Sequence, residues 1–202
     1  MKIISYLLLM CCGVAQAIEY ADVKLGDLPG PAVKIVRDGD NNFQDVMMRE
    51  WTDRVYTDEG TQQYVYQQGY DYSKKEGYIR VLDLQGNIVR EEYSAKTDGG
   101  VSREETQLAF ELFKAHPEIQ KQLQNLKEKI YIYGGFNYLD QKSDQACYSG
   151  NRCVHIFAST ISNPLVAHAV VRLNDKTIPY PEYDTDPVVM ELLKGRLKKR
   201  DK

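Results

Sequence analysis

Residues 102–119, SREETQLAFELFKAHPEI, decide the fold class of this chain. Ser102 and Glu105 have the spacing of a capping box, in which each side chain satisfies a backbone amide of the other residue at a helix start. Pro117 either kinks this helix or opens a second one that extends to about Lys129. Apolar residues at helical spacing predict its buried stripe, formed by Leu108, Ala109, Leu112, Phe113, Ala115 and Ile119.

Strand-like runs flank the helix on both sides. Upstream, residues 62–94 hold tyrosine- and valine-rich runs separated by turns, which predicts an antiparallel meander. Downstream, the apolar period returns to two in residues 130–133, 154–158 and 165–173. Strands, then a helix, then strands predict an α+β fold in which the helix packs across one face of an antiparallel sheet.

The segment before the meander shows two different patterns. Residues 33–36, VKIV, predict a short strand. Residues 41–56, NNFQDVMMREWTDRVY, are interpreted as a helix with Asn42 as its cap, because three large apolar residues fall into one helical stripe: Phe43, Met47 and Trp51.

Residues 1–17 have the features of a secretory signal peptide. They carry one lysine, an apolar run from Ile3 to Cys12, and the small residues Ala15 and Ala17 around a glutamine. The apolar run is shorter than the roughly 20 residues that span a bilayer. We therefore expect export to the periplasm or the extracellular space, with no transmembrane segment in the mature chain.

Two cysteines remain once the signal segment is removed, Cys147 and Cys153. In an oxidising compartment two cysteines across a short turn are expected to form a disulfide. A reactive dithiol is the alternative, but the C-x-x-C spacing of redox motifs is absent. A zinc site would need further ligands, so we predict no metal here.

Charge argues against nucleic acid as a partner. Without residues 1–17 the chain holds 25 basic and 29 acidic residues, a net charge of −4. Residues 194–202, KGRLKKRDK, contain six of the basic residues, so the rest of the chain is strongly acidic. An acidic surface does not release counterions from phosphates. The basic residues instead suit the end of a predicted C-terminal helix within residues 187–202.

His155 and His168 are the most suggestive polar pair. If residues 154–159 and 164–172 form a hairpin that turns at Ile161-Ser162, paired residue numbers add up to 323, which sets the two histidines directly opposite each other. Adjacent imidazoles can bind a transition metal or act as an acid–base pair. No local motif supplies a third ligand, so we predict neither a metal nor another cofactor.

The fifteen tyrosines are the other unusual feature, and several of them cluster in the predicted meander. Tyrosine offers a large contact area at a low entropy cost, which favours a binding surface. It is also a common residue of half-exposed strands, so a purely structural role is equally open. The candidate binding tyrosines are Tyr64, Tyr66, Tyr70 and Tyr72.

Four segments between residues 102 and 184 resemble a known family: SREETQLAFELFKAHPEI, KIYIYGGF, CVHIFAST and AHAVVRLNDKTIPYPEYD. They are similar to the small N-terminal accessory domains of copper amine oxidases, which have a cystatin-like α+β fold. Nothing that follows could serve as the catalytic domain of that family. Asn137-Tyr138 is followed by Leu139, where a cofactor-forming tripeptide has an acidic residue. The resemblance therefore implies a fold and no catalytic residue.

These observations divide the chain into a signal peptide, an N-terminal segment, an α+β domain and a C-terminal helix with a basic tail, at residues 1–17, 18–60, 61–186 and 187–202. Nucleotide-binding and serine-hydrolase motifs are absent from the sequence. We expect an exported, non-enzymatic protein that binds an unknown partner through the tyrosine-bearing sheet or its edge. The alternatives are a cystatin-like inhibitor and a small exported enzyme that uses carboxylates with His155 and His168.

Overall fold

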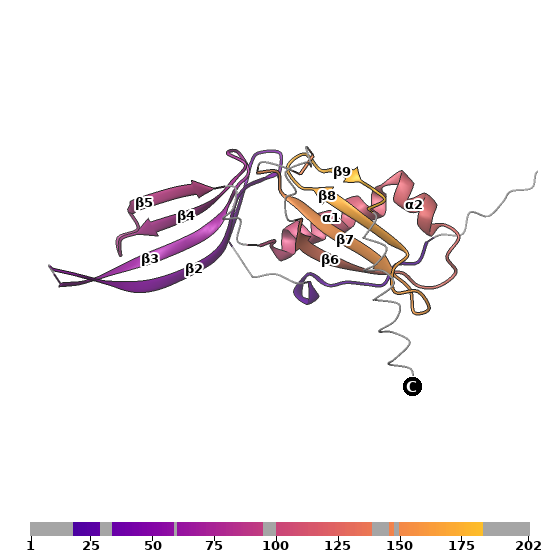
Figure 1. The fold of residues 1–202 in the computed structure, drawn as a ribbon, viewed down its shortest axis with the longest axis horizontal. Coiled ribbons are helices and arrows are strands. Elements are labelled where there is room, and N and C mark those ends of the chain that lie inside the picture. Colours follow the sequence, from indigo (N-terminus) through magenta and orange to yellow (C-terminus); the bar gives the residue numbers. More distant parts are fainter. Residues whose placement is uncertain are drawn as a thin grey trace, which may run out of the picture.

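The structure is a computed structural model that describes residues 18–28, 34–58, 60–94, 100–138, 146–147 and 150–183. The predicted signal peptide and the predicted C-terminal helix lie outside these ranges. The described chain forms two antiparallel sheets and two α-helices, a mixed α+β fold (Figure 1). None of the helices in these ranges is both long and apolar enough to cross a membrane. The elements are the 3-10 helix η1 (Leu25–Asp27), β1 (Lys34–Arg37), β2 (Phe43–Thr57), β3 (Gly60–Asp71), β4 (Glu76–Leu82), β5 (Ile88–Ser94), α1 (Arg103–Ala115), α2 (Pro117–Leu123), β6 (Tyr131–Asn137), β7 (Cys153–Ser159), β8 (Ala167–Arg172) and β9 (Thr177–Tyr180).

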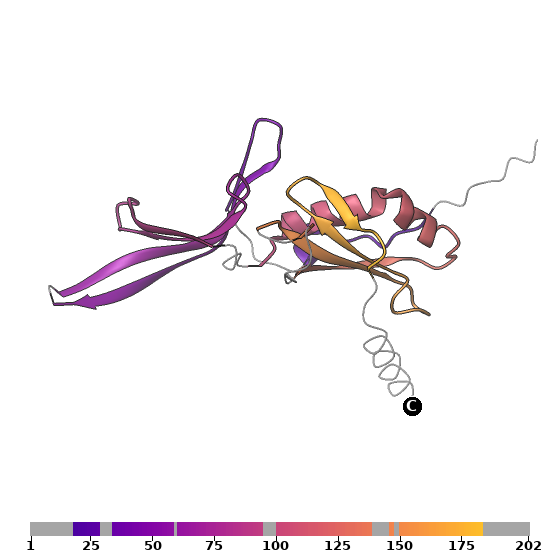
Figure 2. The same cartoon turned by 45° about the horizontal axis from the view of Figure 1, so that its top comes forward.

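The first sheet contains β1 to β5 in chain order, and each strand is antiparallel to the next. The antiparallel meander predicted for residues 62–94 is thereby confirmed. The long β2–β3 hairpin extends away from the helices and the second sheet (Figures 1 and 2). Residues 18–60 contribute β1 and β2 to this sheet, while Tyr20 forms an isolated bridge to Ile130 beside the second sheet.

The helix predicted for residues 41–56 is wrong, because this segment forms strand β2 and pairs with β3 along its length. The predicted stripe of Phe43, Met47 and Trp51 has a spacing of four residues, which fits one face of a helix and one face of a strand equally well. A β-bulge between Met47 and Arg49 obscures the strand pattern further, because a bulge inserts one residue and so shifts the two-residue alternation by one position. Long-range pairing with β3 overrides this local pattern.

The second sheet contains β6 to β9 in chain order, all antiparallel. Alternate residues of β7, namely Val154, Ile156 and Ala158, are fully buried. They belong to one apolar cluster with α1, α2, β6 and β8, which includes Phe110, Phe113, Ile119, Leu123, Ile132, Ala169 and Val171. Strand β9 was missed in the sequence because it is short and interrupted by a proline.

Helix α1 starts as predicted. Ser102 Oγ accepts a hydrogen bond from the backbone N–H of Glu105 (3.1 Å), and the Glu105 carboxylate accepts one from the backbone N–H of Ser102 (2.7 Å). Of the two roles predicted for Pro117, the structure shows the second, because this residue opens the separate helix α2. Helix α2 ends at Leu123 instead of continuing to Lys129.

The buried face of α1 differs from the predicted stripe. Thr106, Ala109, Phe110 and Phe113 are buried, whereas Leu108 and Leu112 are partly buried and Ala115 is exposed. The buried Glu105 lies on the same side of the helix as Thr106 and Ala109. The predicted stripe omits the polar residues Glu105 and Thr106 and also Phe110, so it is displaced around the helix relative to the buried face.

Candidate functional site

The two candidate histidines come together in a register different from the predicted one. Phe157 pairs with His168 and His155 with Val170, so paired numbers add up to 325 instead of 323. The predicted direct pairing is wrong because the connection between β7 and β8 is centred further along the chain. His155 and His168 are instead diagonal neighbours on one face, a separation that long side chains still bridge. Their Nδ1 and Nε2 atoms are 2.9 Å apart.

Aromatic rings surround this histidine pair. The ring of Phe157 stacks on His168 at 4.1 Å between centroids, and Tyr183 packs edge-on at 4.9 Å. Tyr138 lies 5.1 Å from His155. Burial lowers the pKa of both imidazoles, and the nearby His155 contributes to lowering the pKa of His168 to about 4. Both histidines are therefore neutral near pH 7 and share one N–H···N hydrogen bond.

No third ligand joins the pair within the ranges that the structure describes, where no group of three or more histidine, cysteine, aspartate or glutamate side chains could hold a metal ion. Two grooves of about 280 and 420 Å³ lie elsewhere, around the β1–β2 turn. Neither is lined by His155 or His168. The described geometry thus offers a packed, neutral pair that lies outside both of these grooves.

The depressed pKa of His168 predicts a pH-dependent stability. In the unfolded chain this histidine binds a proton near pH 6.5, whereas in the folded chain it does so near pH 4. The unfolded state therefore binds more protons between these values, and the free energy of unfolding falls as the pH is lowered, by at most about 1.4 kcal/mol per pH unit from this group. Urea titrations between pH 4 and 7 should show a shallower decline for His168→Gln. Parallel curves for both proteins would contradict this prediction.

The candidate tyrosines form one row along β3, but they occupy two environments. Tyr70 is buried, and its hydroxyl donates a hydrogen bond to the backbone oxygen of Gly150 in the loop before β7. Tyr72, just beyond β3, donates to the Glu105 carboxylate at 2.5 Å. Both contribute to the junction between the two sheets. Tyr64 and Tyr66 lie on the outer part of the strand, away from that junction.

The outer part of the first sheet carries an apolar stripe around Tyr66, flanked on the same face by the charged residues Asp53, Arg90 and Glu92. Trp51 stacks on Tyr66 with ring centroids 5.3 Å apart, and the Arg49 guanidinium lies over Trp51 at 4.9 Å. The strand register adds Tyr64, Ile79 and Val81 to the same face. We call Trp51, Tyr64, Tyr66, Ile79 and Val81 the tyrosine face. Trp51 was missed as a site residue because its segment was interpreted as a helix.

A buried ion pair lies at the junction. Arg152 contacts the Glu105 carboxylate, with Nη2 and Oε2 3.0 Å apart, and both side chains are almost fully inaccessible. The Arg152 guanidinium also lies over the ring of Tyr70 at 4.7 Å. Desolvation would raise the pKa of Glu105, but Arg152 and the hydrogen-bond donors hold it below the usual value. This network links the base of the first sheet to α1 and the second sheet.

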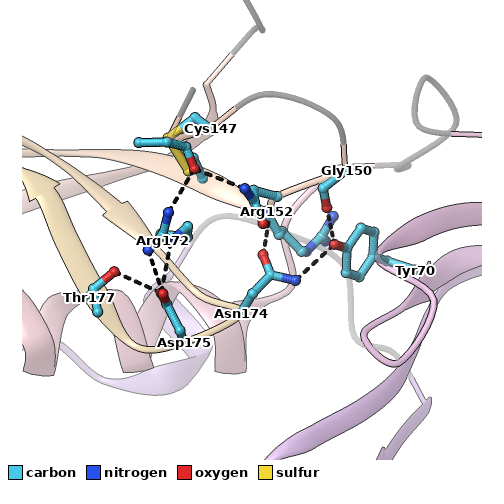
Figure 3. Close-up of a disulfide and its surroundings, with 11 residues drawn as sticks. Tyr70, Cys147, Gly150, Arg152, Arg172, Asn174, Asp175 and Thr177 are labelled. Atoms are coloured by element: carbon cyan, nitrogen blue, oxygen red, sulfur yellow. Dashed lines mark hydrogen bonds and ion pairs between the residues drawn. A yellow bond between two sulfur atoms is a disulfide. The ribbon is translucent and has the colours of Figure 1, made fainter. Parts of the chain in front are cut away.

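The predicted disulfide between Cys147 and Cys153 is present and brackets the loop that supplies this network (Figure 3). In the same view, the Asn174 side chain lies between Arg152 and Tyr70. It accepts a hydrogen bond from the backbone N–H of Arg152 and donates one to the Tyr70 hydroxyl at 3.0 Å.

No family model matches the chain, and comparison with curated proteins and with solved structures gives no match.

Proposed function

We propose that this is an exported, non-enzymatic protein that binds a partner protein through its tyrosine face. One observation carries the proposal. In the described chain, neither a helix nor a strand of the second sheet approaches the outer part of the first sheet (Figures 1 and 2). Its tryptophan, two tyrosines and two aliphatic side chains are all partly exposed. A partner with an apolar surface would bury them.

The residue types of this face support an interface. Tryptophan and tyrosine are enriched among the residues that contribute most to protein–protein binding. The stacked pair of Trp51 and Tyr66 is already ordered in the free chain, so little side-chain entropy remains to be lost on binding. The junction holds the base of the same strands through Tyr70 and Tyr72. The face is thus presented on a supported sheet.

Export is supported by two independent features. Residues 1–17 have the pattern of a cleavable signal peptide. The disulfide between Cys147 and Cys153 is of the kind that persists in oxidising compartments. We further propose that α1 and the second sheet form a cystatin-like unit, which the shared apolar core of α1, β6, β7 and β8 supports.

Site-specific cross-linking tests the proposed interface. A photoreactive phenylalanine analogue at position 66 should yield a covalent adduct with a partner protein in the native host. The same analogue at position 131 is the control, because Tyr131 is an exposed tyrosine of β6 in the second sheet. Once the partner is purified, Trp51→Ala should weaken binding by roughly 30-fold, whereas Tyr131→Ala should not. Equal adducts at both positions, or none at position 66, would contradict the proposal.

A further inference from the structure

Strand β2 has a long free edge. It pairs with β1 only as far as the Lys34–Met47 pair, and from Met48 to Thr57 its one partner in the described chain is β3. Half of the backbone N–H and C=O groups along this stretch therefore point away from the sheet. Such an edge is a template for pairing with another strand.

The order of charges on this edge is unusual. Arg49, Glu50, Asp53 and Arg54 are all exposed. Charged side chains on an edge normally discourage pairing with a second chain. Their effect on pairing between two copies of β2 depends on the register, because the register decides which charges stand opposite each other.

Symmetry restricts the possible registers. A two-fold axis perpendicular to the sheet makes two copies of a strand antiparallel and keeps every side chain on its own face. Residues that stand opposite each other must therefore both be even or both be odd in number. Alignments centred on Trp51 and on Thr52 both satisfy this rule without opposing like charges, but the one centred on Trp51 has room only for residues 48–54 before it reaches β1. The alignment centred on Thr52 pairs Met48 with Tyr56 at its ends, so it uses more of the free edge and stops where β1 begins.

This alignment is complementary in charge. Glu50 stands opposite Arg54 of the second copy, and the symmetry produces this pair twice. Thr52 faces its own copy, which is a favourable cross-strand pair. Arg49 faces Val55 and Trp51 faces Asp53, so no like charges are opposite each other.

The other free edge of the first sheet lacks this property. On β5, the registers centred on Arg90, Glu91 and Glu92 each place a charged residue opposite its own copy, and those centred on Val89 and Tyr93 pair no opposite charges. Like charges directly opposite each other destabilise a strand pair. Self-complementarity is therefore a property of β2 and is not a general consequence of charged edge strands.

We infer that two copies of this chain associate through the free edge of β2, in the antiparallel register centred on Thr52. The association joins the two first sheets into one continuous sheet. Because the two-fold axis keeps each face on its own side, both tyrosine faces lie on the same side of that sheet. This inference goes beyond the proposed function and does not depend on it.

The test is the molar mass of the mature chain in solution, measured by light scattering after size-exclusion chromatography. We expect a dimer for the native sequence. Glu50→Arg and Arg54→Glu should each raise the dissociation constant at least about 100-fold, because each sets two like-charge pairs at the interface. An equimolar mixture of the two variants should form a heterodimer, because every contact between positions 50 and 54 then joins opposite charges.

Arg90→Glu and Glu92→Arg on β5 are the matched controls. They make the same charge changes at an exposed pair and should leave the dimer intact. A monomeric native chain would overturn the inference, as would dimeric single variants or a mixture that stays monomeric. Cross-linking at position 66 reports on the partner protein independently, so failure of the dimer and failure of the proposed function are distinguishable.

Discussion

Replacing Arg152 by methionine should lower the free energy of unfolding by about 3–5 kcal/mol. The substitution removes the cation that compensates the buried carboxylate of Glu105, whose side chain has no exposed surface. Tyr72 and the backbone N–H of Ser102 would remain as its hydrogen-bond donors, and neither carries a charge. The contact with the ring of Tyr70 would also be lost.

Chemical denaturation followed by circular dichroism measures this effect. Arg90→Met is the matched control, because Arg90 and Glu92 form an exposed ion pair worth at most about 1 kcal/mol. Adding Glu105→Leu to Arg152→Met should recover part of the loss, since it removes the uncompensated charge. Similar small effects of Arg152→Met and Arg90→Met would show that the junction is not a stabilising contact.

Phe113→Ala should cost about 3–5 kcal/mol of stability, because it removes a fully buried ring and leaves a cavity. Phe113 belongs to the cluster that α1 shares with β6, β7 and β8. Leu112→Ala should cost clearly less, since Leu112 is only partly buried. Gln107→Ala, on the exposed side, should have almost no effect.

The same denaturant titrations distinguish the observed core from the stripe predicted by sequence. A larger loss for Leu112→Ala than for Phe113→Ala would mean that α1 is rotated about its axis relative to the described structure. Equal and small losses would mean that α1 is peripheral to the fold.

Features governed by neighbouring residues were predictable from the sequence. The capping box places Ser102 and Glu105 three residues apart, so the start of α1 follows from local hydrogen bonding. The meander of β3, β4 and β5 has short turns and pairs neighbouring strands. The pair Cys147 and Cys153 spans a short loop, and no other cysteine lies beyond residues 1–17.

The β2 error shows where this reasoning fails. A four-residue spacing of apolar residues fits both a helix and a strand, and the bulge that disturbs the strand alternation depends on how β2 pairs with β3. The histidine register was misplaced for a related reason. Local composition places the turn between β7 and β8 one residue too early, which changes the sum of paired residue numbers by two and moves direct partners to diagonal positions.

By itself, the sequence determined the fold class, the start of α1, the meander and the disulfide, because each depends on residues close together in the chain or on their alternation. The tertiary structure decided that Arg152 forms an ion pair with Glu105 and that Tyr70 and Tyr72 form hydrogen bonds at the junction. It also decided that Trp51 stacks on Tyr66 on a face that no other described element covers. These contacts connect residues far apart in the sequence. Their energies come from packing, desolvation and pairing between elements, which no local pattern encodes.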